Sequence, residues 1–479
     1  MKEGYIPQEQ RKNILLLTDD IRLQSGVANV GKEIVLHTAH HYNWYNLGGA
    51  INHPELGKIF DISEDINKVA GITDSKVMVQ PNNGYGDPES IRRLIKDQNI
   101  DAIFLITDPR YFTWLFSMEN EVRKKTPIIY LNIWDDYPAP MYNKSYYESC
   151  DMLLGISKQT VNINKLVLGE KAKDRIIEYV PHGMNADFFF PIEKDTPEFE
   201  ELEKFKTNVF QGKKPKFTLF FNSRNIRRKA IPDTMLAWKY FIDQLPEEEA
   251  SQCHFILHTD VISEHGTDLS AVKDYIFGSD YPNIHFSTNK LPTTQLNMLY
   301  NLADAQILLT SNEGWGLTLT EAMLAGTPII ANVTGGMQDQ MRFVDGNGDW
   351  FTPSAEVPSN HTGKYKKHGK WAFPVYPSNR SLVGSPQTPY IWDDRCDPED
   401  ATKRIMELYN MSREERKELG LTGREWAIGD EAGFTAEHQG KRVIKHIDKL
   451  LSTWTPRKHY ELINTNQVKE DVLPHKLLY

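Results

Sequence analysis

The chain of 479 residues is longer than one hydrophobic core usually serves, so two or three domains are expected. Hydrophobic residues at 40%, charged residues at 25% and a formal net charge of −10 indicate a globular protein and argue against a general nucleic-acid binder, while leaving room for a local basic groove. The three cysteines are widely spaced, and there is neither an apolar leader at the N-terminus nor a long apolar run, so a cytoplasmic protein without a transmembrane segment is expected.

The first part of the chain alternates short apolar runs with helical stretches. Residues 13–18 (NILLLT) are the first predicted strand, and a Ser25-Gly26 turn and a helix over about 27–37 follow. A strand, a glycine turn and a helix in this order open a Rossmann-like unit. Further apolar runs have the length of buried parallel strands and lie at 102–106, 128–133 and 152–156.

A charged segment bounded by Pro and Gly, residues 192–216, is interpreted as a linker between domains. A second alternation follows it, with strands predicted at 217–221, 254–258, 306–310 and 328–331. Residues 350–395 do not fit this alternation, because they are rich in Pro, Gly, Ser, Trp and Tyr, and they are interpreted as a long irregular insertion that is either functional or disordered. Helical periodicity returns from about 398 to 451.

The predicted fold class is therefore α/β, with two doubly wound Rossmann-like domains that face an interdomain cleft. The first domain is expected over residues 1–195. The second is expected over 210–425, with the insertion at about 350–395. Residues 426–479 are expected to form C-terminal helices and a tail that pack back on the first domain.

Residues 313–331, EGWGLTLTEAMLAGTPIIA, form the most informative segment. Its two carboxylates, Glu313 and Glu321, are separated by a glycine turn that leads into a helix, whose free N–H groups suit an anion. A helical rise of about 1.5 Å per residue places the two carboxylates up to ~12 Å apart. A retaining glycosidase needs its pair about 5 Å apart, so the two glutamates are interpreted as separate hydroxyl anchors. The alternative is a strand, turn and helix with a chance pair of surface glutamates.

This segment resembles the E-x7-E motif of glycosyltransferase family four, whose members adopt the GT-B fold. Residues 223–230 (SRNIRRKA) are similar to the family's G-R-x-x-x-x-K-G, and residues 180–185 (VPHGMN) to its P-N-G-V-D segment. Cys150-Asp151 with Ile156-Ser157 resembles the strand before that segment, and Gly335-Gly336 matches the glycine pair after the second motif. The resemblance covers about residues 10–345 and implies an acceptor-side first domain and a nucleotide-sugar-binding second domain.

The resemblance also implies a role for each matching residue. Glu321 would bind ribose hydroxyls, Glu313 would contact the transferred sugar, and the cations near residue 229 would stabilise the departing diphosphate. The implied catalytic residues are Arg224, Lys229 and Glu313. The implied donor-binding residues are Gly26, Gly314, Trp315, Gly316, Leu317, Thr318 and Glu321. A solvated basic loop is the alternative for residues 224–229, and a plain turn is the alternative for Gly26.

The acceptor side departs from the family pattern. The family often carries a His-Asp pair after a strand of the first domain, whereas this chain has Ile133-Trp134-Asp135-Asp136, without the His. Asp135, Asp136 and His182 are the acceptor-side candidates, and an N-capping role is the alternative for the aspartates. Ser223 and Ala230 replace the two glycines of the basic motif, and both are small enough for its turn to survive.

The expected activity is a retaining, metal-independent glycosyltransferase, either a hexosyl- or a pentosyltransferase. A UDP- or GDP-sugar would be the co-substrate, with no permanently bound cofactor. Neither Asp-X-Asp nor His-Glu-X-X-His nor Cys-X-X-Cys occurs in the sequence. No carboxylate nucleophile is obvious, so front-face substitution is expected. Alternatives are a non-catalytic sugar-nucleotide-binding subunit and a phosphorylase that would need pyridoxal phosphate.

The acceptor stays open between a glycan, a lipid, a small molecule and nucleic acid. Residues 361–390 carry four lysines, one arginine and no carboxylate, and aromatic residues are interleaved with them at Tyr365, Trp371, Phe373 and Tyr376. Basic and aromatic side chains together are typical of nucleic-acid binding, so one interpretation is a nucleic-acid partner bound through Lys364–Trp371, as in a phage or viral DNA glycosyltransferase that acts on a hydroxylated base. The alternative is a basic loop that covers the donor site or binds a phosphorylated glycan or lipid head group.

Overall fold

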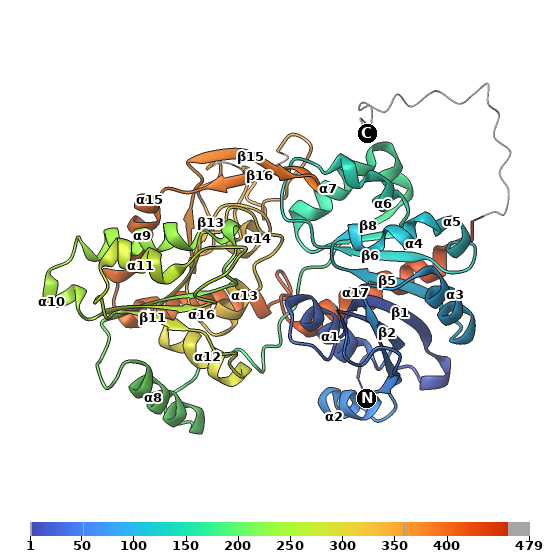
Figure 1. Cartoon of the computed structure of the whole chain (residues 1–479), viewed down its shortest axis with the longest axis horizontal. Coiled ribbons are helices and arrows are strands. Elements are labelled where there is room, and N and C mark those ends of the chain that lie inside the picture. The colour runs from blue at the N-terminus through green and yellow to red at the C-terminus, as the bar shows by residue number, and fades with distance from the viewer. Residues whose placement is uncertain (1, 51, 358–360, 362, 458–479) are drawn as a thin grey trace.

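The computed structural model describes residues 2–50, 52–357, 361 and 363–457, which form two α/β lobes lying side by side (Figure 1). Each lobe is built on one largely parallel sheet covered by helices. Within the described residues, no helix combines the length and the apolar character needed to cross a membrane.

The first lobe holds an eight-stranded sheet in the order β3-β4-β2-β1-β5-β6-β7-β8, in which only the pairing of β3 with β4 is antiparallel. Its elements are β1 (Lys12–Asp19), α1 (Gly26–Thr38), β2 (Tyr42–Ala50), β3 (Phe60–Asp61), α2 (Ser63–Ala70), β4 (Val77–Asn83), α3 (Pro88–Asp97), β5 (Ala102–Ile106), α4 (Thr113–Ser117), α5 (Glu119–Val122), β6 (Ile128–Asn132), α6 (Lys144–Glu148), β7 (Met152–Gly155), α7 (Lys158–Leu168) and β8 (Ile176–Tyr179).

The second lobe holds a six-stranded, all-parallel sheet in the order β11-β10-β9-β12-β13-β14, the strand order of a doubly wound Rossmann domain. Its elements are α8 (Pro197–Val209), β9 (Phe217–Asn222), α9 (Ile231–Ile242), α10 (Glu247–Ala250), β10 (Cys253–His258), α11 (Leu269–Phe277), β11 (Ile284–Ser287), α12 (Thr293–Leu302), β12 (Ala305–Leu308), α13 (Leu317–Leu324), β13 (Ile329–Asn332), α14 (Met337–Met341), β14 (Ala372–Val375), β15 (Asn379–Ser385), β16 (Thr388–Arg395), α15 (Pro398–Tyr409) and α16 (Arg413–Ile428). The last helix, α17 (Ala436–Thr453), returns to the first lobe.

The predicted strands are present because their apolar runs are buried on both faces. In β1, residues 14–17 are fully buried, and all five residues of β5 are buried as well. Helices cover both faces of such a sheet, so side chains on either face are removed from water. Strand β2 (YNWYNLGGA) is equally buried but was not predicted, because its Asn, Tyr and Gly residues interrupt the apolar run.

Two segments contain regular structure that was not predicted from the sequence. The segment 192–216 was interpreted as a linker, but it contains α8, whose apolar residues recur at helical spacing and bury Leu202. The segment 350–395 was interpreted as an irregular insertion, but it contributes β14 to the edge of the second sheet and then forms the β15–β16 hairpin. Only part of it is therefore additional to the Rossmann-like unit.

The chain passes between the lobes twice, after β8 and again between α16 and α17. The two passages are hydrogen-bonded to each other. The N–H of Met184 donates to Phe434 O at 3.0 Å, and the N–H of Ala436 donates to Met184 O at 2.9 Å. Helix α17 then packs on α1 of the first lobe (Figure 1), where Tyr42 donates to Asp448 at 2.7 Å. The predicted tail after residue 457 lies outside the described residues.

Candidate active site between the lobes

A buried charge cluster lies at the ends of β9 and β12, where the two strongest motifs of the sequence meet. The Glu313 carboxylate accepts a hydrogen bond from Arg228 Nη1 at 3.0 Å and a shorter one from Lys229 Nζ. The backbone fixes the same contact, because Arg228 O accepts from the N–H of Ser311 at 2.8 Å. The basic loop and the E-x7-E loop are thus one unit.

The charges of this cluster offset the cost of its burial. Only 12% of the Glu313 side chain and 9% of the Lys229 side chain are exposed. Burial alone would raise the pKa of Glu313, but Arg228 and Lys229 outweigh it and hold this pKa at about 2. Burial lowers the pKa of Lys229, and the Glu313 charge counteracts that effect. Glu313 is therefore ionised at neutral pH.

The glycine turn after Glu313 leaves the N-terminus of α13 open. Gly316 has φ 91°, in the left-handed region, and no side chain caps the helix that begins at Leu317. The glycine pair packs directly against this turn. A Cβ at Gly335 would lie 1.8 Å from Glu313 O, and one at Gly336 would lie 2.1 Å from Gly314 O. Any side chain at either position would displace the turn.

The N-terminus of α1 in the first lobe lies opposite the N-terminus of α13. A Cβ built on Gly26, the first residue of α1, would lie 3.9 Å from Leu317 Cδ1. Ser25 caps α1, and its Oγ accepts from the N–H of Ala28 at 3.0 Å. Two helix N-termini from different lobes therefore converge, and both favour negative charge between them.

Glu321 lies one helical turn into α13. Its carboxylate accepts from the hydroxyl of Tyr300 at 2.6 Å and from Asn222 Nδ2 at 3.5 Å. Burial raises its pKa to about 7, and the Tyr300 hydrogen bond only partly opposes this rise. Among the described residues, Glu321 thus has no cationic partner, in contrast to Glu313. Thr318, between the two glutamates, is partly exposed on the same first turn.

Of the two aspartates after β6, only Asp135 faces the candidate site. Its Oδ1 accepts from the N–H of Gly314 at 3.0 Å, and its Oδ2 lies 3.9 Å from Arg228 Nη2. Asp136 is buried and bonded to Gln159 Nε2 and to Thr334 Oγ1, both at 3.1 Å. Its assignment to the acceptor side was wrong, because this side chain is enclosed between the lobes.

His182 lies beside Glu313 on the loop after β8. Burial lowers its pKa to about 4, and the Glu313 carboxylate counteracts part of that effect, so the ring is neutral at neutral pH. Its Nδ1 is buried and has no hydrogen-bond partner in the described part of the chain. His182 does not line the acceptor-side pocket described below, so the structure places it with the E-x7-E loop.

The structure adds detail to two other assignments from the sequence, and that of Arg224 stays a prediction. Arg224 is exposed, and its side chain makes no hydrogen bond or ion pair with the described residues, whereas Arg228 contacts Glu313. Arg228 was not singled out, although it lies in the same basic run. The side chain of Trp315 is 2% exposed, with Nε1 donating to Thr320 Oγ1 at 3.0 Å. Trp315 can therefore meet a ligand only through its backbone.

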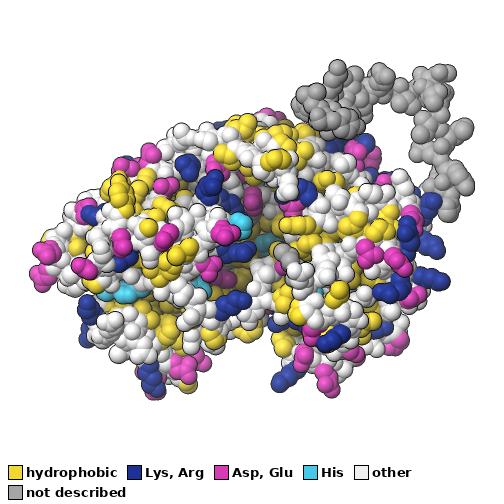
Figure 2. Space-filling view, in the orientation of Figure 1, with side chains coloured by type: hydrophobic (Ala, Val, Ile, Leu, Met, Phe, Trp, Pro, Cys, Tyr) yellow, Lys and Arg dark blue, Asp and Glu magenta, His cyan; other side chains and the backbone are white. Residues whose placement is uncertain are grey.

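A pocket of about 750 Å³ adjoins the charge cluster on the side of Asp135. The first lobe supplies one wall, the loop 227–228 another, and the β15–β16 hairpin the third. Figure 2 shows the surface hollowed between the two lobes. We call this cavity the hairpin pocket. Its lining includes Asp108, Arg110, Trp134, Asp135, Arg227, Arg228, Asn312, Ser381, Val383, Ile391, Asp393 and Arg395.

The aromatic residues that favoured a nucleic-acid partner are largely structural. Trp371 is 5% exposed and stacks on Trp426, and Phe373 is 4% exposed within β14. Tyr365 and Tyr376 are partly buried against His361. These rings are already packed against neighbours, so base stacking on Lys364–Trp371 is not supported by the arrangement of the described residues.

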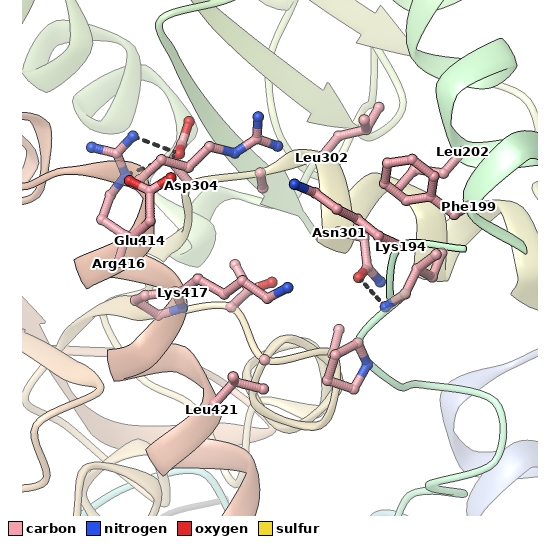
Figure 3. A pocket seen from close by; sticks show the side chains of 18 of the residues that line it. Lys194, Phe199, Leu202, Asn301, Leu302, Asp304, Glu414, Arg416, Lys417 and Leu421 are labelled. Atoms are coloured by element: carbon pink, nitrogen blue, oxygen red, sulfur yellow. Dashed lines mark hydrogen bonds and ion pairs between the residues drawn. The ribbon is translucent and has the colours of Figure 1, made fainter. Parts of the chain in front are cut away.

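A second cavity, of about 380 Å³, lies at the other end of α13 (Figure 3). Its walls come from α8, α12, α16 and the passage between the lobes, and Lys194 and Lys417 extend into it. It contains none of the predicted site residues. Within the described residues, no group of three or more His, Cys, Asp or Glu is arranged to hold a metal ion.

Comparison with known proteins gives a family match within the second lobe. Residues 241–356 match the family described as glycosyl transferases group 1. Mannosylfructose-phosphate synthase from Agrobacterium fabrum is 24% identical over 201 residues, which cover 40% of this chain and 39% of that protein. The match thus spans less than half of that relative's length.

The fold is shared over nearly the whole chain. A glycosyltransferase from Rickettsia africae and sucrose-phosphate synthase from Thermosynechococcus elongatus each superpose with a TM-score of 0.63 at 15% identity, covering 93% of this chain and 100% of theirs. HepE from Anabaena, in complex with UDP and glucose, superposes with a TM-score of 0.60 at 12% identity, covering 92% of this chain and 100% of its own. The predicted GT-B fold and the predicted family resemblance are confirmed.

Proposed function

We propose that this chain, which has the GT-B fold and matches the glycosyl transferases group 1 family over residues 241–356, moves a sugar from a nucleoside-diphosphate sugar to a hydroxyl acceptor with retention at the anomeric carbon. One observation carries the proposal. The ion-paired Glu313, the buried Lys229 and the uncapped N-terminus of α13 lie together opposite the N-terminus of α1. An anionic donor with a sugar attached matches these groups.

The donor would lie along the first turn of α13. Its ribose hydroxyls would meet Glu321, whose carboxylate has no cation of its own to satisfy it. Its diphosphate would meet the N–H groups at Gly316 and Leu317, together with Lys229 and the exposed Arg224. Its sugar would then lie beside Glu313 and the unpartnered Nδ1 of His182. HepE, at a TM-score of 0.60, is solved with UDP and glucose, so a UDP-sugar is the first donor to test and a GDP-sugar the second.

The chemistry needs stabilisation of the leaving diphosphate more than it needs a nucleophile from the protein. The acceptor oxygen forms a bond to the anomeric carbon while the bond from that carbon to the phosphate oxygen breaks. The electron pair of the broken bond leaves with the nucleoside diphosphate, and its phosphate oxygen takes the proton of the acceptor hydroxyl. Lys229 and the α13 N-terminus supply positive charge to the oxygens that gain charge, so no metal ion is assigned to this role.

Attack on the same face as the departing group fits the charges around the anomeric carbon. Glu313 is engaged by Arg228 and Lys229, so its carboxylate is better suited to binding sugar hydroxyls than to forming a covalent intermediate. Asp135 lines the hairpin pocket and also contacts the E-x7-E loop, so its carboxylate lies between an acceptor placed there and the charge cluster. Holding both reactants between the lobes would orient them and exclude water.

The test is release of nucleoside diphosphate from UDP- and GDP-sugars by the full chain, with Lys229→Ala and Glu321→Ala compared with the unchanged protein. We expect UDP-sugar binding to raise the melting temperature of the protein, because the ligand binds only the folded state. Each substitution should reduce turnover at least 100-fold, by the loss of charge stabilisation or of ribose binding. Near-normal turnover in both variants would reject the proposed donor site.

A further inference from the structure

One wall of the hairpin pocket is a face of the β15–β16 hairpin, and the opposite wall comes from the first lobe. In the β15–β16 hairpin, Ser381 pairs with Asp393 and Val383 pairs with Ile391, so these residues share one face of the ribbon. That face lines the pocket. The hairpin is anchored to the first lobe, because Arg110 Nη1 donates to Gln387 O at 2.6 Å and to Thr388 Oγ1 at 2.7 Å. The hairpin therefore covers a cavity that is lined by residues of both lobes.

The carboxylates that line this pocket already have partners. Asp108 is paired with Arg110 and also accepts its backbone N–H at 2.9 Å. Asp135 accepts from Gly314 and lies near Arg228. Asp393 accepts from Ser311 Oγ at 2.9 Å and from Asn312 Nδ2 at 2.8 Å. Each carboxylate of the pocket lining thus already accepts hydrogen bonds from the protein.

Two of the cations that line the pocket have no such partner. Arg227 and Arg395 are both exposed, and neither side chain makes a hydrogen bond or an ion pair within the described residues. Arg395 does lie near enough to Asp233 to lower the pKa of that carboxyl, against the burial that raises it. The two guanidinium groups come from different segments, the basic loop and the end of β16, and both line the same cavity.

We propose that the hairpin pocket binds the acceptor, and that the acceptor is a small phosphate ester whose phosphate is recognised by Arg227 and Arg395. This inference rests on the proposed sugar transfer and names its acceptor class. A guanidinium group offers several N–H donors in a planar fork, which matches the oxygens of a phosphate. The phosphate would lie at the free cations, and the attacking hydroxyl would point toward Asp135 and the charge cluster around Glu313.

The size and the chemistry of the pocket favour a small molecule such as a sugar phosphate. Its volume of about 750 Å³ is within the range of small-molecule sites, and it is bounded by both lobes and by the hairpin. A single-stranded nucleic acid would carry similar phosphates but would also need exposed rings for its bases. The rings that line the pocket, Tyr130 and Trp134, are buried in the first lobe.

The experiment measures transfer from UDP-glucose and GDP-mannose by the full chain to three kinds of acceptor. These are free hexoses, the same hexoses as 6-phosphates, and a single-stranded oligonucleotide that contains 5-hydroxymethylcytosine. We expect the 6-phosphates to be preferred at least 10-fold in kcat/KM. A preference for the free hexoses or for the oligonucleotide, or equal use of all three, would overturn the inference.

Two substitutions then test the arginines themselves. Arg395→Ala is expected to raise the KM for the phosphorylated acceptor about 10-fold, and Arg395→Ala with Arg227→Ala about 100-fold, because charge-assisted hydrogen bonds are lost. Arg395→Lys should recover part of the loss. The preference for the phosphorylated hexose over the free hexose should shrink with the same substitutions, which a merely structural role would not produce. An unchanged KM in the double variant would overturn the inference.

The controls separate this inference from the proposed function. Arg93→Ala removes an exposed arginine of α3 and should leave the KM unchanged. Stabilisation of Arg395→Ala by UDP-glucose shows that the variant is folded and still binds the donor. If the unchanged protein neither binds nor hydrolyses any donor, the proposed function fails. If the unchanged protein hydrolyses a donor but uses no hexose 6-phosphate better than the corresponding free hexose, only the acceptor inference fails.

Discussion

The Oδ1 atom of Asp135 accepts a hydrogen bond of 3.0 Å from the backbone N–H of Gly314, and this contact joins the two lobes beside the charge cluster. Gly314 is buried, and a Cβ at its position would lie 2.7 Å from Ile133 O and 3.2 Å from Asp135 Oδ1. The glycine therefore lets the E-x7-E loop approach the end of β6 closely enough for the bond to form.

Asp135→Ala should destabilise the protein more than Asp135→Asn. Alanine leaves the buried N–H of Gly314 without an acceptor, which costs about 1 to 3 kcal/mol. Asparagine keeps a side-chain oxygen for this bond while removing the charge that Arg228 faces. Chemical denaturation of the two variants measures the difference. Equal stability of the alanine and asparagine variants would mean that the bond contributes nothing.

Lys229 and Glu313 should show strong energetic coupling. Removing one partner of a buried ion pair leaves an uncompensated charge and costs about 3 to 5 kcal/mol. We therefore expect Glu313→Gln and Lys229→Met to be less destabilising together than the sum of the two single effects, by at least about 1 kcal/mol. A double-mutant cycle in urea gives this coupling, and additive effects would contradict it.

The same pair predicts a pH dependence of stability. The folded-state pKa of Glu313, about 2, lies below the ordinary value of 4.5. Its contribution to stability is therefore complete above about pH 4.5 and is lost as the pH falls toward 2. The stability difference between the unchanged protein and Glu313→Gln should accordingly shrink between pH 5 and pH 3. A constant difference over that range would show that the carboxylate is not ion-paired.

Donor binding should strengthen as the pH rises through about 7. Burial raises the pKa of Glu321 to about 7, so its carboxylate form, which accepts bonds from two ribose hydroxyls, becomes dominant only above that pH. Calorimetric titration with UDP-glucose between pH 6 and pH 8 measures the effect. The intact sugar diphosphate is preferable to UDP, whose terminal phosphate titrates at about 6. Glu321→Gln should bind more weakly and without this dependence.

The free energy of unfolding should fall as the pH rises through the pKa of Glu321, whereas donor binding should strengthen. A carboxyl whose folded pKa is raised contributes stability that is lost as the pH rises from 4.5 through about 7. Glu321→Gln should therefore become more stable than the unchanged protein above pH 7, by on the order of 2 kcal/mol, although it binds the donor less well. A variant that is less stable at pH 8 would contradict the raised pKa.

Ala230→Gly should stabilise the protein. Ala230 has φ 48°, in the left-handed region, where a residue with a Cβ is strained and where the family motif carries glycine. Relief of this strain exceeds the entropy cost of glycine, and we expect a gain of up to about 1 kcal/mol in the free energy of unfolding. Ala237→Gly, inside α9, is the matched control and should lose about 1 kcal/mol or more.

The sequence predicts the parts of this fold that depend on local apolar pattern. The runs at 13–18 and 102–106 are buried by helices on both faces, so their composition alone indicates parallel strands. Strand β14 could not be recognised in the same way, because Phe373 and Pro374 follow a stretch of Lys, Gly and His that resembles a loop. In α8, charged residues conceal the apolar spacing of Phe199, Leu202 and Phe205.

The site could be predicted as a set of motifs but not as a set of contacts. The resemblance selects Glu313 and Lys229, and these two are in direct contact. It cannot choose between the arginines of one basic run, because the 3₁₀ turn Arg227–Lys229 decides which of them faces Glu313. The resemblance could not predict the hairpin pocket, because Arg110 and Arg395 come to line one cavity only when the hairpin packs on the first lobe.

The two hydrogen bonds that join the chain passages at Met184 fix these passages to each other. Met184 is held on both sides by the backbone of Phe434 and Ala436, and Gly183 lies so close to Thr435 that a Cβ would be 2.4 Å from its carbonyl oxygen. The crossing is therefore one of several connections between the lobes, and any separation of the lobes at the site must also break contacts such as the bond from Gly314 to Asp135.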